Sequence, residues 1–507
     1  MKKTVFIKNA MILTVSSLVL RFAGIIFKVW LAALVGSEGI GLYQLVFSVY
    51  ILAATFATTG ISTAVTRLVA EELALGSKKG TVKILRRSLE ITLIIAAISV
   101  GVVFFGAEFI AIKLLDDIRA VPALKILPLS LPFMGVSSCI RGYFIARRKA
   151  TPSAVTQLLE QAVRIAVVVV LVKSFIHKGL GVCCAAVIMG DVIAEALACL
   201  VLWLTYISDR KKLDSLSGRS RPPYGILRKI LHISVPITSG RYLNTALRTA
   251  ENLLVPKNLA KYPLSGKNAL SQFGMIKGMA LPILFFPSAV LNSVSTLLIP
   301  EMSEAAARNQ KALVTSATQK ILKLTAVISF IFAAIFFVAG EEIGFLIYKE
   351  KDVGFLLKAL SPIVPLMYLD SISDGILKGL DQQTFSFRTS VSDSAIRIVM
   401  IILLLPVTGL NGFIGIMYFS NLLTCLLNVG RLLKVSRAKF KIGEELLLPL
   451  TSALCITLLA DTLLALFPIK SILVYIILIC AISLPFYFVL LLLFGVISKE
   501  DIKNVLK

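Results

Sequence analysis

The chain has very little of what metal binding and histidine chemistry require. Only two of its 507 residues are histidines, His177 and His232, and they are far apart in the sequence. The seven cysteines fall in apolar stretches and show no Cys-x-x-Cys or other metal-ligand spacing, which is the pattern of small buried thiols. We therefore expect neither a catalytic residue nor a metal site.

The sequence also lacks the motifs that mark the common enzyme classes. It contains no Walker sequence, no nucleophile elbow and no dinucleotide-binding fingerprint, which are the motifs that hold phosphates or activate a nucleophile. Charged residues are scarce, at 16% of the chain, and only 28 of them are acidic. ATP-driven or enzymatic function therefore lacks support, no cofactor is expected, and only a coupling Na⁺ or H⁺ remains open.

What the chain has in abundance is long apolar stretches, and 57% of its residues are hydrophobic. A helix that crosses a bilayer needs about 20 mostly apolar residues, and about fourteen stretches of this kind lie between residues 9 and 496. Because an open β-sheet would leave unpaired backbone groups in lipid, the sequence predicts an all-α integral membrane protein with about 14 transmembrane helices. The first stretch is too long for a signal peptide and is interpreted as a retained helix.

The net charge of +25 is explained by membrane topology rather than by nucleic acid. Most lysines and arginines lie in alternate connections between the apolar stretches, for example in segments 78–87, 147–149 and 210–229. An excess of basic residues in short loops marks the cytoplasmic side of a membrane. We expect a multi-pass protein of the cell membrane, with both termini cytoplasmic and no nucleic-acid partner.

The second half of the chain repeats the first. The stretch from Gly41 to Glu71 matches the stretch from Ser271 to Glu301 at an offset of 230 positions. Further on the offset becomes 233 and stays there, pairing Leu124-Lys125 with Leu357-Lys358, Pro132 with Pro365, Met134 with Met367, Gly142 with Gly375, Glu160 with Asp393, Arg164 with Arg397 and Gly179 with Gly412.

Each repeat holds six predicted helices, and an even number places the start of both repeats on the same side of the membrane. The two lobes are therefore predicted to be parallel, as in transporters built from repeats about an axis along the membrane normal. The predicted domains are an N-lobe at 1–212, a cytoplasmic linker at 213–229, a C-lobe at 230–437 and a C-terminal helix pair at 438–507.

This organisation and four short motifs resemble the multidrug/oligosaccharidyl-lipid/polysaccharide (MOP) exporter superfamily. The resemblance is strongest to its polysaccharide-biosynthesis branch, which includes sporulation proteins and lipid II flippases. The motifs are Arg21-Phe22-Ala23-Gly24, Gly39-Ile40-Gly41-Leu42-Tyr43-Gln44, Thr59-Gly60-Ile61-Ser62-Thr63-Ala64-Val65 and Ile140-Arg141-Gly142-Tyr143. The resemblance implies a V-shaped helical bundle that exports undecaprenyl-diphosphate-linked saccharides, above all lipid II for peptidoglycan of the spore cortex, by alternating access.

Basic residues within the apolar stretches are the predicted substrate-binding residues: Arg21, Lys28, Arg241, Arg248 and Lys277. A cation at membrane depth costs about 2.5–3.5 kcal/mol even on lenient scales, so it should face water, a partner or an anion. Arg21 and Lys28 share one helix face, and Arg241 and Arg248 repeat their spacing. We predict that these cations converge on a cavity that binds a diphosphate. The alternative is that they reach the interface or pair with internal acids.

The resemblance also implies a coupling cation in the second lobe. The matching candidates in this sequence are Glu251, Asp393, Asn421 and Thr424. Asp393 precedes Arg397 by four residues, which a helix places on the same face. The alternative is therefore that Asp393 serves as the partner of this arginine.

Arg164 has the same relation to Glu160, so both Arg164 and Arg397 are predicted to be structural, paired cations. Arg141 lies near the cytoplasmic end of its apolar stretch and is predicted to anchor the helix at the interface. Asp191 and Glu195 lie one helical turn apart. They are either a proton site or solvated acids near an interface, and the sequence does not decide between the two.

Several functions remain open at this point. A capsule or teichuronic-type unit also carries a polyprenyl diphosphate, so the saccharide is not fixed. A multidrug antiporter on the same fold would need acids in its cavity, whereas the first helix here carries only cations. A third hypothesis is a non-transporting membrane scaffold for cell-envelope synthesis partners. The leading prediction is a flippase whose partners are a polyprenyl-diphosphate-linked saccharide and membrane lipids.

Overall fold

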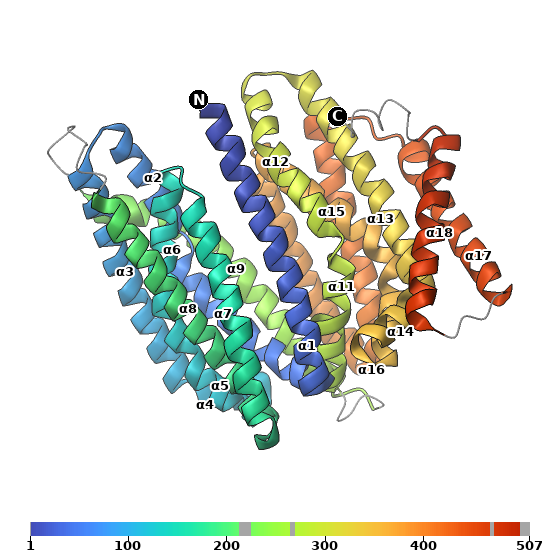
Figure 1. Ribbon diagram of the computed structural model, residues 1–507, viewed down its shortest axis with the longest axis horizontal. Helices are drawn as coiled ribbons and strands as arrows, with labels where there is room; N and C mark the ends of the chain where they lie inside the picture. The colour runs from blue at the N-terminus through green and yellow to red at the C-terminus, as the bar shows by residue number, and fades with distance from the viewer. Residues whose placement is uncertain (1, 212–224, 264–268, 467–470, 497–507) are drawn as a thin grey trace. The chain divides into compact units, whose positions relative to one another are not determined.

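The computed structural model describes residues 2–211, 225–263, 269–466 and 471–496. Within these ranges the protein consists of helices and connecting turns, with no strand (Figure 1), which confirms the predicted all-α class. The chain divides into two compact units, Met1–Lys257 and Asn258–Lys507. We refer to them as unit 1 and unit 2.

Unit 1 begins with a very long helix that is broken once. At Gly36 the backbone has φ 69°, so α1 consists of two helices that meet at a kink, and glycine adopts such a conformation without steric cost. The α-helices are α1 (Lys2–Thr58), α2 (Ile61–Ala74), α3 (Lys78–Phe105), α4 (Ala107–Phe109), α5 (Val121–Ile126), α6 (Leu131–Ala146), α7 (Thr151–Phe175), α8 (Leu180–Lys211) and α9 (Ile226–Leu259). Short 3₁₀ or π turns join them at Ile110–Leu115, Ile118–Ala120, Leu127–Ser130 and Ile176–Lys178.

Unit 2 contains a second long helix with one break, at Gly409 of α16, where φ is 58°. Its α-helices are α10 (Ala269–Phe273), α11 (Leu281–Phe285), α12 (Ser288–Ala307), α13 (Lys311–Tyr348), α14 (Lys351–Leu360), α15 (Val364–Gly379), α16 (Gln383–Ser436), α17 (Leu448–Leu466) and α18 (Ile472–Leu493). The π-helical segment η6 (Gly274–Ala280) continues α10, and further short turns are Ser361–Ile363 and Ile442–Leu447.

The described helices account for the predicted number of membrane crossings. Ten segments are long and apolar enough to span a membrane, among them Val15–Ala74 and Gln383–Ser436. Each of these two contains one of the glycine breaks and supplies two crossings. Helix α9, which is less apolar, and the run from α10 through α12 complete the set of about 14 helices. The protein is a multi-pass membrane protein.

The internal repeat is visible in the local structure. Residues with positive φ end helices at positions that differ by the same offset of 233: Gly76 and Asn309, Asp116 and Lys349, Arg148 and Asp381. Equivalent ion pairs also recur, at 2.9 Å between Lys125 and Glu108 and at 3.0 Å between Lys358 and Glu341. The repeat that the residue identities predict therefore also appears in the turns that end the helices and in the ion pairs. The parallel relation of the lobes and their boundaries stay predictions.

Helix α9 belongs almost entirely to unit 1, although the repeat assigns it to the second lobe. Its first turns bury Ile226 and Ile230 in an apolar core that includes Ile61, Val65 and Ile140. The helix begins at Ile226, inside the range assigned to the linker, and most of the remaining linker lies outside the described residues. The contact of α9 with α2 and α6 therefore explains its membership of unit 1.

The close approach of α9 to Gly60, just before α2, can be tested by substitution. Its φ is 44°, and an added Cβ atom would meet the Ser234 carbonyl and the Thr238 hydroxyl of α9. We expect Gly60→Ala to lower the melting temperature, because overpacking costs about 1–3 kcal/mol. The matched control is Gly101→Ala, where an added Cβ atom meets nothing within 4 Å. Thermal unfolding of the purified protein in detergent measures both, and equal melting temperatures would contradict the close contact.

Candidate functional site

Between Val15 and the break at Gly36, α1 carries two cations, Arg21 and Lys28, in an otherwise mostly apolar stretch. Arg21 is exposed and Lys28 is half-buried, and their neighbours Phe22 and Ile26 are exposed as well. Neither cation makes an ion pair with a carboxylate of the described residues. The structure thus places both predicted residues on an accessible helix, with their charges available to an anion.

Helix α9 carries the second predicted pair, Arg241 and Arg248, and both side chains are exposed. Among the described residues, neither arginine is ion-paired with an acid. The same stretch of α9 packs on the second half of α1, where Thr249 Oγ1 donates a hydrogen bond to the Ser48 carbonyl at 3.1 Å and Asn252 Nδ2 donates one to Ser48 Oγ at 3.0 Å. Unit 1 therefore holds four of the five predicted binding residues on two helices that touch.

The remaining predicted binding residue, Lys277, lies in unit 2 on the π-helical segment η6. Its side chain is half-buried, and its ammonium nitrogen is 5.9 Å from the centroid of the Phe413 ring. A cation at this distance from an aromatic face is attracted by about 0.5–2 kcal/mol. This aromatic contact helps to hold the charge of Lys277 in place.

The predicted coupling residues are divided between the units. Glu251 is buried in unit 1, whereas Asp393, Asn421 and Thr424 lie on α16 in unit 2. The Asn421 side chain donates a hydrogen bond to the Met417 carbonyl of its own helix at 2.7 Å. A coupling role for these four residues stays a prediction.

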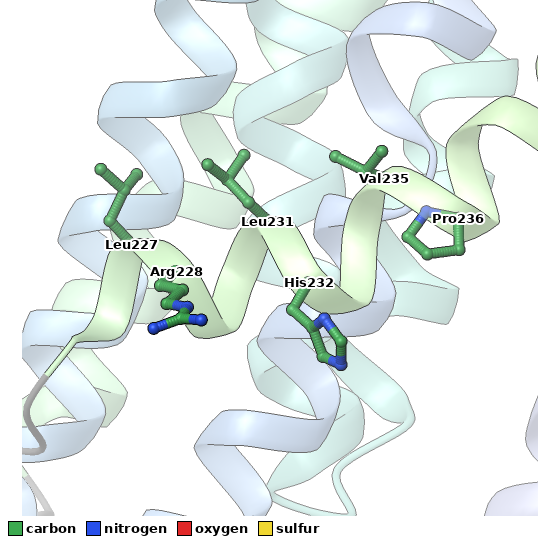
Figure 2. Close-up of a pocket in the computed structure, with 6 residues that line it drawn as sticks. All are labelled: Leu227, Arg228, Leu231, His232, Val235 and Pro236. Carbon is green, nitrogen blue, oxygen red and sulfur yellow. The ribbon is translucent and has the colours of Figure 1, made fainter.

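A shallow pocket of about 480 Å³ runs along the first turns of α9. Figure 2 shows Leu227, Leu231 and Val235 on one side of the helix, with Arg228 and His232 on the other. The three aliphatic side chains are between 40% and 56% exposed. An exposed apolar stripe is what a membrane protein presents to lipid chains, so we do not assign the pocket to a specific ligand.

A buried ionic cluster joins three helices of unit 1. Glu160 of α7 accepts hydrogen bonds from Arg164 Nη2 at 2.7 Å and from Arg141 Nη2 of α6 at 2.9 Å, one on each carboxylate oxygen. Arg164 Nε also lies 2.7 Å from Asp191 Oδ1 of α8. The carboxylates of Glu160 and Asp191 are 14% and 7% exposed. Removing one partner of such a buried ion pair lowers stability strongly, because the other charge stays buried without its partner.

The equivalent positions of unit 2 hold a second polar cluster. Arg397 Nε lies 3.4 Å from Asp393 Oδ2, and Ser420 Oγ donates a hydrogen bond to Asp393 Oδ1 at 2.6 Å. Asn428 Nδ2 donates a hydrogen bond to Asp370 Oδ1 at 2.7 Å. The predicted pairing of Asp393 with Arg397 is therefore confirmed.

The cluster in unit 1 also corrects one prediction and removes one of two alternatives that the sequence left open. Arg141 was expected to anchor its helix at the interface, but its side chain is only 22% exposed and its guanidinium bonds Glu160. Asp191 and Glu195 are 5% and 4% exposed, which excludes solvated acids at an interface. Spacing and the repeat identified the pair of Glu160 and Arg164, but not the contacts that Arg141 and Asp191 make with it.

Comparisons with known proteins agree with this architecture. The family model described as "Polysaccharide biosynthesis protein" matches residues 6–305, which is more than half of the chain. Stage V sporulation protein B of Bacillus subtilis (strain 168) is 28% identical over 453 residues, covering 88% of this chain and 86% of that protein. The lipid II flippase MurJ of the same bacterium is 21% identical over 440 residues, covering 82% of this chain and 81% of that protein.

Solved structures share the fold. Lipid II flippase MurJ in an inward closed conformation has a TM-score of 0.73 at 15% identity, covering 97% of this chain and 99% of that one. An inward-facing multidrug resistance MATE transporter of the MOP superfamily has a TM-score of 0.67 at 14% identity, covering 86% of this chain and 99% of that one. The chain belongs to the polysaccharide biosynthesis protein family.

Proposed function

We propose that the protein is an alternating-access flippase that exports an undecaprenyl-diphosphate-linked saccharide. The observation that carries this proposal is the set of exposed cations on α1 and α9, above all Arg21, Arg241 and Arg248, which have no carboxylate partner among the described residues. Each such cation costs about 2.5–3.5 kcal/mol at membrane depth. A bound anion offsets this cost, so these side chains suit a substrate with a compact negative charge.

A diphosphate fits these side chains in shape as well as in charge. The planar guanidinium of an arginine can bond two phosphate oxygens at once, and a lysine adds a point charge. In this proposal Arg21, Lys28, Arg241, Arg248 and Lys277 bind the headgroup. The polyprenyl chain stays in the surrounding membrane lipids, which are uncharged at that depth and cannot compete for these cations.

The proposed saccharide lipid is lipid II, the peptidoglycan precursor, exported for the spore cortex. Two relatives of this chain, stage V sporulation protein B and the lipid II flippase MurJ of Bacillus subtilis, support this choice. The proposed location is the cell membrane, with both termini cytoplasmic, because basic residues are concentrated in the connections that share a side with the termini. Cell-envelope synthesis enzymes would supply the precursor on that side.

The driving force can come from the membrane potential and from a coupling cation. An inside-negative potential favours outward movement of an anion by about 2.3 kcal/mol per charge for each 100 mV. A coupling Na⁺ or H⁺ would add its own gradient, and Glu251, Asp393, Asn421 and Thr424 are the residues proposed from family resemblance. No other cofactor is required by this scheme.

Depletion of the protein tests the substrate directly. We expect lipid II to accumulate in depleted cells, because a blocked flippase leaves its substrate on the cytoplasmic side. Polyprenyl-linked precursors extracted from depleted and control cells would be identified by mass spectrometry. Accumulation of a capsule or teichuronic-type unit instead would replace lipid II as the substrate. Unchanged levels of every polyprenyl-linked precursor would contradict the flippase proposal.

A further inference from the structure

The connection from α16 to α17 is a short segment that is bound to the side of α13. Residues 437–441 join two segments that are long and apolar enough to cross a membrane, so they lie near the membrane surface. Thr315 Oγ1 of α13 donates a hydrogen bond to the Ser436 carbonyl at 2.6 Å, and Gln319 Nε2 donates one to the Lys439 carbonyl at 2.9 Å. We call residues 437–441 the basic strap, and these two bonds hold its backbone against α13.

The basic strap turns its small side chains toward the protein and its cations away from it. Ser436, just before the strap, and Ala438 are 3% and 8% exposed, whereas Arg437, Lys439 and Lys441 are exposed. The Ala438 amide donates a hydrogen bond to Ser436 Oγ at 3.3 Å. An alternation of buried and exposed residues is typical of an extended segment. Three cations therefore lie in a row on the outer side of the strap.

Three cations at this surface have no acidic partner. Among the described residues, Arg437 and Lys439 make no ion pair with a carboxylate, and neither does Lys320 of α13. A helix C-terminus also attracts cations, but this effect is confined to the last turn of the helix. The end of α16 can thus account for Lys434, but not for Lys439 or Lys320.

The acids nearby are too few to balance the basic residues. Lys441 pairs with Glu444 at 2.9 Å, and Glu445 lies near Lys323. The strap and the helix ends beside it hold six basic residues, Lys320, Lys323, Lys434, Arg437, Lys439 and Lys441, and two acids, Glu444 and Glu445. Six positive and two negative charges leave a net charge of +4 on this surface.

The corresponding part of unit 1 is neutralised within the protein. At the offset of 233, Lys320 aligns with Arg87 and Lys323 aligns with Glu90. Arg87 Nη1 lies 2.7 Å from Glu90 Oε2, so unit 2 has a further lysine where unit 1 has the acidic partner. The basic strap also has no counterpart, because α8 continues as a helix through the aligned positions 204–208. The excess of positive charge is therefore particular to this surface of unit 2.

We propose that the basic strap and the adjoining part of α13 bind the headgroup of an acidic phospholipid, of which phosphatidylglycerol is the probe used below. The planar guanidinium of Arg437 can bond two oxygens of a phosphate, and Lys439 and Lys320 add point charges. Basic residues beside a membrane-spanning segment attract acidic lipids to the membrane surface. Ile442, which follows the strap, is 61% exposed and offers an apolar contact to the acyl chain of the same lipid.

The bound lipid would connect the composition of the membrane to the C-terminal helix pair. Both α17 and α18 pack on α13 (Figure 1), and the Tyr487 hydroxyl of α18 donates a hydrogen bond to the Val327 carbonyl of α13 at 3.0 Å. The lipid site is independent of the proposed substrate. Its failure would leave the flippase proposal standing, and failure of the depletion experiment would leave the lipid site standing.

Photocrosslinking of the full-length protein tests the proposal. The protein would be reconstituted in phosphatidylcholine vesicles that contain a trace of photoactivatable phosphatidylglycerol or of photoactivatable phosphatidylcholine, and peptide mass spectrometry would locate the crosslinks. We expect the phosphatidylglycerol probe to label residues 437–442 about tenfold more strongly than the other probe. Equal labelling by the two probes overturns the proposal. Displacement of the probe by undecaprenyl diphosphate at lower concentration than by unlabelled phosphatidylglycerol also overturns it, because the strap would then be a docking surface for the substrate.

Neutral variants identify the cations that bind the lipid. Lys320→Gln, Arg437→Gln and Lys439→Gln should each weaken labelling by the phosphatidylglycerol probe about fivefold, the change expected for one basic residue near a membrane surface. The matched control is Arg308→Gln, which removes an exposed arginine of unit 2 that is paired with Glu304. This control should leave labelling of the strap unchanged. Full labelling of a variant that carries all three neutral substitutions contradicts the proposed site.

A glycine variant separates the loss of charge from a folding defect. Arg437 has φ 55°, a left-handed conformation that glycine adopts without steric cost. Arg437→Gly therefore removes the charge while making the backbone conformation easier to adopt. We expect its labelling by the phosphatidylglycerol probe to fall as in Arg437→Gln, with no decrease in the melting temperature in detergent. Normal labelling of Arg437→Gly would show that charge at this position does not bind the lipid, and it would overturn the role of the strap.

Discussion

Replacing Arg21 and Lys28 together by alanine is expected to slow lipid II flipping by about 100-fold or more. Each residue is expected to give the diphosphate a charge-assisted contact worth about 1.5–3 kcal/mol, and about 1.4 kcal/mol corresponds to a tenfold change. Folding should be little affected, because neither cation has an ion-pair partner to lose among the described residues. Labelled lipid II in proteoliposomes that contain the purified protein would measure the rate.

Two control variants show whether the loss of rate comes from the charges at positions 21 and 28. The exchanged variant Arg21→Lys with Lys28→Arg keeps both charges and should retain much of the rate. Arg86→Ala removes an exposed arginine of α3 that is paired with Glu90, and it should leave flipping unchanged. A double alanine variant that flips lipid II normally contradicts the proposed role of α1. If the unaltered protein also exports ethidium, the multidrug antiporter becomes the better explanation.

The contacts that lie within one helix could be predicted from the sequence. Residues four apart share a helix face, so the pairs of Glu160 with Arg164 and Asp393 with Arg397 follow from spacing alone, and they are observed at 2.7 Å and 3.4 Å. The number of helices follows in the same way, because the length of an apolar stretch is a local property. The repeat is likewise a pattern along the chain and needs no knowledge of packing.

Contacts between different helices could not be predicted from the sequence. Arg141 and Asp191 meet Glu160 and Arg164 only because α6, α7 and α8 pack together, and no local spacing encodes that choice. The position of Arg141 near a helix end therefore suggested an interface anchor, which was wrong. The contact of Thr249 with Ser48 joins residues 201 positions apart and ties α9 to unit 1. The repeat assigns that helix to the second lobe, and this boundary stays a prediction.

For charged residues within the apolar stretches, the sequence likewise identified the residues but not their surroundings. Arg21, Lys28, Arg241 and Arg248 could be singled out because a cation is rare in an apolar stretch, and the structure leaves the three arginines exposed. Asp191 and Glu195 were singled out as well, but the sequence left open whether they are a proton site or solvated acids. Only the packing of α8 shows that both are buried and that Asp191 lies 2.7 Å from Arg164.

Replacing Arg164 by leucine is expected to destabilise the protein by about 3–5 kcal/mol, the usual cost of removing one partner of a buried ion pair. The arginine bonds Glu160 and lies 2.7 Å from Asp191, so its loss leaves carboxylates that are only 14% and 7% exposed without this partner. Such a change is a large fraction of the stability of a typical domain. Thermal unfolding of the purified variant in detergent should show a clearly lowered melting temperature.

The cause of this loss can be separated from a packing defect. Arg67→Leu removes an exposed arginine whose side chain is 69% accessible and paired with Glu71, and a surface pair contributes only about 0–1 kcal/mol. A triple variant that adds Glu160→Gln and Asp191→Asn to Arg164→Leu removes the stranded charges. It should regain much of the stability, because neutral amides cost less to bury than unpaired carboxylates. A triple variant as unstable as Arg164→Leu would mean that side-chain shape, rather than charge, is what the cluster of α6, α7 and α8 depends on.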